Sequence, residues 1–421
     1  MPSFRAPSIR PIGFAPQEIT ARINHRVVEQ HAAEAAFLWM QRDHAAYAPQ
    51  YKLKHLAKLD ARVMAHLSGL QVAANVGADI AVRMLSELDP GVLFVAAFIS
   101  FGNQDAKWMY QVLQLAMRDG HFEHALLAAL RWLDLSTIYP SLTRLLASPV
   151  AVHRRIGLSA LIAHRVDADR EVRRAMEDSD ASLRAAGFRA VGEGKRRELI
   201  VSAEKGLRDA DPVCRFWAAW SLSLCGDSAA ATICFDAGWA QPSLRSIALE
   251  SVLRCGEPNW ARDVVRSLAS SAETRREAIQ GVGIFGDPVT VPWLLELVDD
   301  PKSARLAGEA LSAITGVDLD YSNLTSDAPE EDPDVHPDDA ELPMPNADAV
   351  REWWSQHQRD FSVGQRYMRG LPVSAGNAAT VLREGYQRQR VGAAIEQTRL
   401  TESALFSVDA RADLQRKALG S

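Results

Sequence analysis

The sequence predicts an all-α protein, an α-solenoid of helical pairs with atypical helical caps at both ends. The first observation is an arginine that recurs with spacings of 30, 31, 30, 30 and 30 residues. Its positions are Arg154, Arg184, Arg215, Arg245, Arg275 and Arg305. A period of about 20–50 residues is typical of stacked repeats. The second observation is that the chain lacks sustained period-2 alternation of apolar and polar residues, the pattern of a half-buried strand.

The residues after each arginine predict the second helix of a pair. A very small residue follows three positions later, and an apolar residue follows seven positions later in five of the six copies. Positions four apart lie on one face of a helix. The small residues are Gly157, Gly187, Ala218, Ala248, Ala278 and Gly308. Because glycine weakens a helix, its presence at this register indicates close approach of a neighbouring helix.

Turn and cap signals complete each pair. An apolar residue eight positions before the arginine recurs in four copies, and a turn rich in Asp, Pro and Ser follows it. Glycine stands eleven positions after the last four arginines, where a left-handed cap would end the helix. These glycines are Gly226, Gly256, Gly286 and Gly316. One pair cannot bury its apolar stripe alone, whereas a stack of pairs can.

An aspartate precedes the arginine by six residues in three copies. The three pairs are Asp178 and Arg184, Asp209 and Arg215, and Asp299 and Arg305. This spacing, with Pro or Ser in the turn, resembles the HEAT repeat family, especially its short bacterial form. The resemblance implies that these six residues form a structural ladder of hydrogen bonds between repeats, with Asp209 as the partner of Arg215. Ser148, Trp239 and Ala269 replace the aspartate in the other copies, so the ladder would be broken there.

Composition indicates an ordinary folded protein. The 421 residues are 47% hydrophobic and 24% charged. The net charge of −6 argues against a general nucleic-acid binder. All four cysteines lie within the repeats and none forms a CxxC pair, which favours reduced, structural thiols. We therefore expect no nucleic-acid partner.

The remaining segments predict five parts. Residues 1–18 would form an irregular N-terminal arm, 19–136 an N-terminal helical cap with irregular repeats, 137–320 the regular repeats, 321–347 an acidic Pro-rich linker or loop, and 348–421 a small C-terminal helical cap. The linker prediction rests on eight acids and three prolines between Asp327 and Glu341. The N-terminal arm has no continuous apolar stretch, and the longest apolar run is about half a membrane span. We expect a cytoplasmic protein without a membrane partner.

Most of the chain shares one further resemblance. The 59–77 stretch, the repeats, the Trp353-Trp354 pair and the 366–372 segment together resemble a family of uncharacterised bacterial HEAT-repeat proteins. That family is associated with type VI secretion loci, near spike-tip proteins and their effectors. It defines no catalytic or binding residues that could be carried over.

Catalysis has little support in the sequence. Some HEAT-like enzymes hold iron with His-Glu pairs, but no histidine here is followed by glutamate. His121 and His124 share a helix face with Glu123 between them, and an exposed helical edge explains them better than a metal pair. No Gly-rich phosphate loop or nucleophile elbow appears. We expect no enzyme activity, no catalytic residue, no metal site and no cofactor.

The leading functional hypothesis is a non-enzymatic interaction scaffold. It would act as an adaptor or chaperone-like factor for a type VI secretion effector or spike-tip protein. An immunity protein that neutralises a cognate toxin is the alternative, and an enzyme with an unrecognised metal site on the repeats is the alternative of another class. The candidate partner-binding residues are Trp353, Trp354, Arg366, Tyr367, Arg383, Arg388 and Arg390. The oligomeric state stays open.

Overall fold

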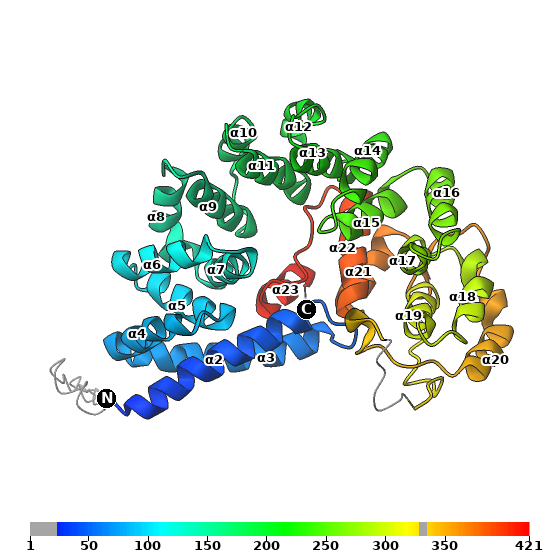
Figure 1. The fold of residues 1–421 in the computed structure, drawn as a ribbon, viewed down its shortest axis with the longest axis horizontal. Helices are drawn as coiled ribbons and strands as arrows, with labels where there is room; N and C mark the ends of the chain where they lie inside the picture. Colours follow the sequence, from blue (N-terminus) through cyan, green and yellow to red (C-terminus); the bar gives the residue numbers. More distant parts are fainter. Residues whose placement is uncertain (1–22, 328–334, 421) are drawn as a thin grey trace, which may run out of the picture. The chain divides into compact units, whose positions relative to one another are not determined.

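The computed structural model describes residues 23–327 and 335–420. Helices account for 71% of the structure, and the described residues include 22 α-helices and almost no strands, which confirms the all-α class (Figure 1). The predicted N-terminal arm, residues 1–18, lies outside the described residues, as does the 328–334 part of the predicted linker. In the described part, no helix combines the length and apolar character needed to cross a membrane.

One small hairpin corrects the expectation that no sheet would form. Strand β1 (Tyr367–Met368) pairs antiparallel with β2 (Leu371–Pro372). The two turn residues, Arg369 and Gly370, have φ angles of 52° and 75°. Two consecutive positive φ angles make the tight turn that matches the twist of a two-residue hairpin.

The chain divides into two compact units. The first contains the residues up to Met40 together with Ala61–Leu133, and the second contains Gln41–Asp60 together with Asp134–Ser421. Two long helices therefore contribute to both units. They are α2 (His25–Ala45) and α3 (Leu53–Val72).

The first unit is completed by four α-helices and a short 3₁₀ turn. They are α4 (Ala74–Arg83), η1 (Met84–Glu87), α5 (Pro90–Gly102), α6 (Ala106–Ala116) and α7 (Gly120–Trp132). Asp89 caps α5 by accepting a hydrogen bond from the Val92 N–H, and proline follows at the first helical position. Helix α5 is buried along most of its length. The Phe94 ring stacks on Trp39 with ring centroids 4.6 Å apart.

The second unit contains six consecutive helical pairs that match the predicted period. They are α8 (Leu135–Leu146) with α9 (Ala151–Ala163), α10 (Asp169–Met176) with α11 (Ala181–Gly194), α12 (Ile200–Gly206) with α13 (Pro212–Leu224), α14 (Ser228–Trp239) with α15 (Arg245–Cys255), α16 (Pro258–Ala269) with α17 (Arg275–Phe285), and α18 (Val291–Leu297) with α19 (Ala304–Thr315). Short 3₁₀ turns, η2 (Arg197–Leu199) and η3 (Pro288–Thr290), precede α12 and α18. Figure 1 shows α10 to α15 following one another in chain order. Each recurring arginine lies in the first turns of a second helix.

The small residue lies where the two helices touch in the first four pairs, whereas Gly308 of the last pair faces Leu319 and Pro345. A Cβ added at Gly187 would be 2.9 Å from the Met176 amide nitrogen of α10, and one at Gly157 would be 3.0 Å from Leu145 Cβ of α8. In two of the three alanine pairs, α12 with α13 and α14 with α15, the glycine lies on the first helix instead. A Cβ at Gly206 would be 2.7 Å from Ala218 Cβ. In these four pairs, the contact between the helices is therefore too close for two full side chains.

The glycines at the ends of the second helices mostly adopt the predicted conformation. Gly226, Gly286 and Gly316 have φ angles of 109°, 81° and 76°. Gly256 is the exception, with an extended backbone at φ −75° and ψ 173°. The prediction of a left-handed cap at Gly256 is therefore wrong.

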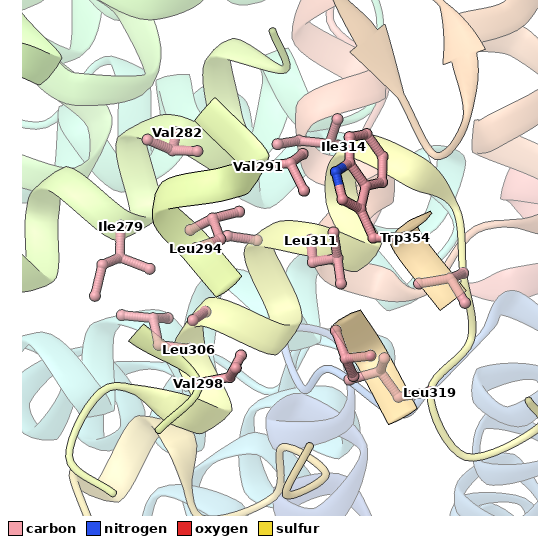
Figure 2. Packing of buried hydrophobic residues seen from close by; sticks show 14 of the residues in the cluster. Ile279, Val282, Val291, Leu294, Val298, Leu306, Leu311, Ile314, Leu319 and Trp354 are labelled. Atoms are coloured by element: carbon pink, nitrogen blue, oxygen red, sulfur yellow. The ribbon is translucent and has the colours of Figure 1, made fainter. Parts of the chain in front are cut away.

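The C-terminal part of the second unit packs on the last pairs. Its elements are η4 (Pro337–Asp339), α20 (Ala347–His357), η5 (Gln358–Asp360), β1, β2, α21 (Ala375–Glu384), α22 (Gln387–Leu400) and α23 (Ala412–Leu419). Trp354 of α20 belongs to a buried apolar cluster that includes Ile314, Leu311 and Leu319 (Figure 2). Burial of large apolar side chains is the main source of stability for such packing.

The described part of the acidic stretch is held against the helical pairs. Both carboxylate oxygens of Asp339 accept hydrogen bonds from Arg276 of α17, and Asp339 is 2% exposed. Arg305 donates to the Leu342 carbonyl. Arginines of the last two pairs therefore bind residues that sequence reasoning treated as a linker.

Candidate functional site

Two aspartates join successive helical pairs in the second unit. Arg154 of α9 donates from Nη2 to Asp178, with distances of 2.8 and 3.0 Å to its two carboxylate oxygens. Arg154 also donates from Nη1 to the carbonyls of Ser148 and Pro149 in its own turn, both at 3.0 Å. The Arg154 guanidinium therefore connects two turns, because its Nη1 binds carbonyls of its own turn and its Nη2 binds the carboxylate in the next turn.

The next arginine repeats this geometry. Arg184 of α11 donates from Nε and Nη2 to Asp209, at 2.8 and 2.9 Å. The hydrogen bond from Arg184 is the main cause that lowers the pKa of Asp209 below its usual value. Burial alone would raise the pKa of Asp178, but hydrogen bonds from the Asp180 N–H and from Arg154 outweigh it and lower that pKa. Both carboxylates are thus held ionised. We call each of these ion pairs, between an arginine of one helical pair and an aspartate of the next, a rung.

Each aspartate binds the arginine of the preceding helical pair, and not the arginine that follows it by six residues in the sequence. Arg215 donates to the main-chain carbonyls of Asp209 and Ala210, at 2.7 and 3.0 Å. The expectation that the Asp209 carboxylate pairs with Arg215 is therefore wrong. The Asp209 side chain points toward the preceding pair, because its carboxylate also accepts the Asp211 N–H within the turn.

The third predicted rung differs. Asp299 pairs with Arg351 of α20, and Arg305 donates to the Leu342 carbonyl, so these two ladder residues turn to the C-terminal part of the unit. The residue two positions after Asp299 is Pro301, which has no N–H to hold the carboxylate in the turn. Asp178 and Asp209 instead have Asp180 and Asp211 at that position.

The hairpin binds the ends of the last two second helices. The Tyr367 N–H donates to the Gly286 carbonyl at 2.7 Å. The Arg369 and Gly370 N–H groups donate to the carbonyls of Ala313 and Ile314, at 2.6 and 2.9 Å. The last carbonyls of a helix lack partners within the helix, so the hairpin satisfies groups that would otherwise need water.

Glycine at the end of these helices makes room for the hairpin. A Cβ added at Gly286 would be 2.1 Å from the Tyr367 carbonyl oxygen, and one at Gly316 would be 2.5 Å from the Arg369 carbonyl oxygen. Both glycines therefore serve two purposes, a left-handed cap and the close approach of another backbone.

In the first two pairs, the equivalent position is a basic residue. Arg165 and Lys195 stand eleven positions after Arg154 and Arg184, and they have φ angles of 58° and 47°. The Lys195 ammonium donates to the Thr398 and Thr401 carbonyls, and Arg165 donates to the Leu405 carbonyl. Sequence reasoning missed both residues, although the 30-residue spacing would have found them.

A buried ion cluster fixes α22 to α15. Glu396 is fully buried and accepts hydrogen bonds from Arg366 and Arg399, at 2.7 and 2.8 Å. Arg254 of α15 approaches the same carboxylate at 3.6 Å and also pairs with Glu250. Burial would raise the pKa of Glu396, but the arginines outweigh it and keep that pKa below its usual value.

The C-terminal residues 366–405 therefore contact the ends of the second helices. The contacts run from the ends of α17 and α19 at the hairpin, to α15 at Glu396, and to α9 and α11 at residues 398–405. We call these helix ends, with residues 366–405 bound on them, the second-helix edge. The predicted C-terminal cap would seal only the last repeat, whereas this segment contacts all six second helices, including α13 through α22.

Most of the candidate partner-binding residues contact the rest of the second unit. Trp353 stacks on His357, and both Trp354 and Tyr367 are buried. Arg366 donates to Glu396 and to the Phe285 carbonyl, and Arg388 binds Glu309. Arg390 donates to Leu382, Gln387 and Gln415, whereas Arg383 is exposed and donates to the Leu419 carbonyl. Burial lowers the pKa of Arg390 to about 10. Arg383 is the exposed member of the set.

The described residues supply no third ligand to the histidine pair that the sequence analysis weighed as a metal site. His121 and His124 both lie on α7. Across residues 23–327 and 335–420, no three histidine, cysteine, aspartate or glutamate side chains come together in a way that could hold a metal ion.

No protein family, curated protein or solved structure matches this chain.

Proposed function

We propose that the six helical pairs form a HEAT-like solenoid that serves as a non-enzymatic interaction scaffold. The observation that carries this proposal is the second-helix edge, which already holds the hairpin, α21, α22 and the residues after them through main-chain groups and basic side chains. Such contacts give affinity for a backbone without requiring one particular side-chain sequence.

The rungs support the same proposal. Arg154 with Asp178, and Arg184 with Asp209, connect three successive pairs through largely buried ion pairs. A pre-organised framework loses less conformational freedom when a partner binds, so more of its contact energy appears as affinity.

The second helices are partly covered by other parts of the second unit. Ten residues of α13 are buried, and the C-terminal segment covers the ends of its neighbours. The partner surface is therefore assigned to the exposed side chains of the first helices and to the outer side of the bound C-terminal segment. A standard specific interface buries about 1,200–2,000 Å² in total.

The partner class follows from the sequence resemblance. We propose a type VI secretion effector or spike-tip protein, with the scaffold acting in the cytoplasm as an adaptor or chaperone-like factor. The test is co-purification of the full-length chain from its native host, at low and high salt, with identification of enriched proteins by mass spectrometry. Enrichment of a spike-tip protein or its loading factor supports the adaptor role. A toxin encoded beside this chain supports the immunity alternative.

A matched control makes this experiment specific. Arg383→Glu reverses the charge of an exposed residue of the C-terminal segment, whereas Arg266→Glu reverses an exposed charge on α16. Loss of the partner in one variant and retention in the other locates the interface. If no protein is enriched at either salt concentration, the scaffold proposal is wrong.

A further inference from the structure

Two histidines face each other in the first unit. His31 lies on α2 and His66 on α3, and their Nδ1 atoms are 3.0 Å apart. The ring centroids are 5.1 Å apart and the ring planes make an angle of 64°. The two residues are 35 positions apart, so no short motif reveals the pair in the sequence.

The neighbouring turn of α3 keeps room for this arrangement. A Cβ at Gly69 would be 2.8 Å from His31 Cδ2 and 2.9 Å from its Nε2. Any other residue at position 69 would push the His31 ring away from its present place. The paired imidazoles therefore depend on a glycine that faces one of them.

The spacing of the two nitrogens suits a shared metal ion. Zinc binds histidine nitrogen at about 2.0–2.1 Å, so two ligands at a tetrahedral angle have nitrogens about 3.3 Å apart. For ligands at a right angle, the same bond length gives about 2.9 Å. The observed 3.0 Å lies between these values, so a metal would need shifts of only a few tenths of an ångström.

We propose that His31 and His66 bind one divalent transition-metal ion through their Nδ1 atoms. Imidazole suits Zn²⁺, Ni²⁺ and Cu²⁺. No third protein ligand is in place among the described residues, so water completes the coordination.

This site is independent of the scaffold proposal. It uses residues of the first unit and none of the second-helix edge. A metal here would link α2 to α3, because each helix supplies one ligand. Loss of the metal site would leave the proposed partner binding by the second unit untouched.

Calorimetric titration of the full-length chain with Zn²⁺ and with Ni²⁺ tests the site. We expect one equivalent bound per chain, and at least a tenfold loss of affinity in His31→Gln and in His66→Gln. The control is His121→Gln, an exposed histidine of the same unit, which should bind as the unchanged chain does. Circular dichroism of each variant verifies that the helices remain.

A second measurement needs no variant. Diethylpyrocarbonate labels free imidazoles, and mass spectrometry of the digested chain locates the labels. Added Zn²⁺ should protect His31 and His66 and leave His121 labelled. The proposal is overturned if neither metal binds stoichiometrically, which would leave the pair as a hydrogen bond between two imidazoles, or if bound metal leaves His31 and His66 fully labelled.

Discussion

The early and late helical pairs of the second unit share one repeat signature but are held together differently. Between α9 and α13, aspartates in the turns connect each pair to the preceding arginine. Between α15 and α19, Arg245 pairs with Glu277 of the next pair at 3.5 Å, and three other arginines bind residues from beyond the array. Arg254 approaches Glu396, Arg276 binds Asp339 and Arg305 binds the Leu342 carbonyl.

The turn sequence explains this difference. Asp178 and Asp209 begin Asp-x-Asp turns, in which the second aspartate supplies an N–H to the first and then caps the helix. The later turns contain Trp239, Ala269 and the Asp299-Asp300-Pro301 sequence. A local hydrogen bond therefore decides whether an aspartate forms a rung, whereas the C-terminal segment contacts both the early and the late pairs.

The largest effect is expected at Glu396. Replacing it in Glu396→Gln leaves Arg254, Arg366 and Arg399 without their shared buried carboxylate. Breaking a buried ion pair typically costs about 3–5 kcal/mol, because the remaining charge is uncompensated. Chemical denaturation of the full-length chain should show a loss of this size in the free energy of unfolding.

The control for this change is Glu402→Gln. Glu402 pairs with Arg197, but their side chains are 69% and 61% exposed. Solvent screening leaves such pairs with little effect, so we expect a change below about 0.5 kcal/mol. Equal losses in the two variants would show that the Glu396 cluster does not stabilise the late pairs.

The second effect concerns the contact within an early pair. Gly187→Leu would place a side chain against Met176, and Ala218→Leu would place one against Gly206. Overpacking of this kind typically costs about 1–3 kcal/mol, and sometimes more. Thermal unfolding should show a lower midpoint for both variants. Ala163→Leu, at an exposed position of α9, is the control, and a similar midpoint shift there would contradict the close contact.

The sequence predicted the pairs well because their signals are local. The period of 30 residues, the small residue and the turn chemistry all act within one pair, so the helices and their contacts followed from spacing. The partners of Arg366, Arg388 and Glu396 did not follow, because they depend on how distant segments meet. The candidate residues of the C-terminal segment were chosen for their chemistry, and most of that chemistry serves intramolecular contacts.

The third effect compares a formed rung with an absent one. Asp209→Asn should destabilise the chain by about 1.5–3 kcal/mol, because Arg184 loses a largely buried, charge-assisted bond. Asp299→Asn should cost less than about 0.5 kcal/mol, because Asp299 is 60% exposed in its pair with Arg351.

The pH dependence should distinguish the same two variants. The folded pKa of Asp209 is lowered, so its contribution is present above the unfolded pKa near 3.8 and is lost as the pH falls through the folded value. Urea unfolding between neutral pH and acid should therefore show a steeper loss in the unchanged chain than in Asp209→Asn. Identical slopes would contradict the rung.

The last comparison concerns Arg215, where the ladder ends. Among the described residues, Arg215 donates to two main-chain carbonyls and to no carboxylate, since Trp239 occupies the next aspartate position. Arg215→Ala should therefore cost about 0.5–1.5 kcal/mol, against about 1.5–3 kcal/mol for Arg184→Ala, which also loses the bond to Asp209. Denaturant unfolding of both variants measures the difference. Equal costs would mean that the turn carbonyls, and not the rungs, hold the early pairs. Unchanged stability of Arg215→Ala with loss of a co-purified protein would instead make Arg215 a contact for the partner.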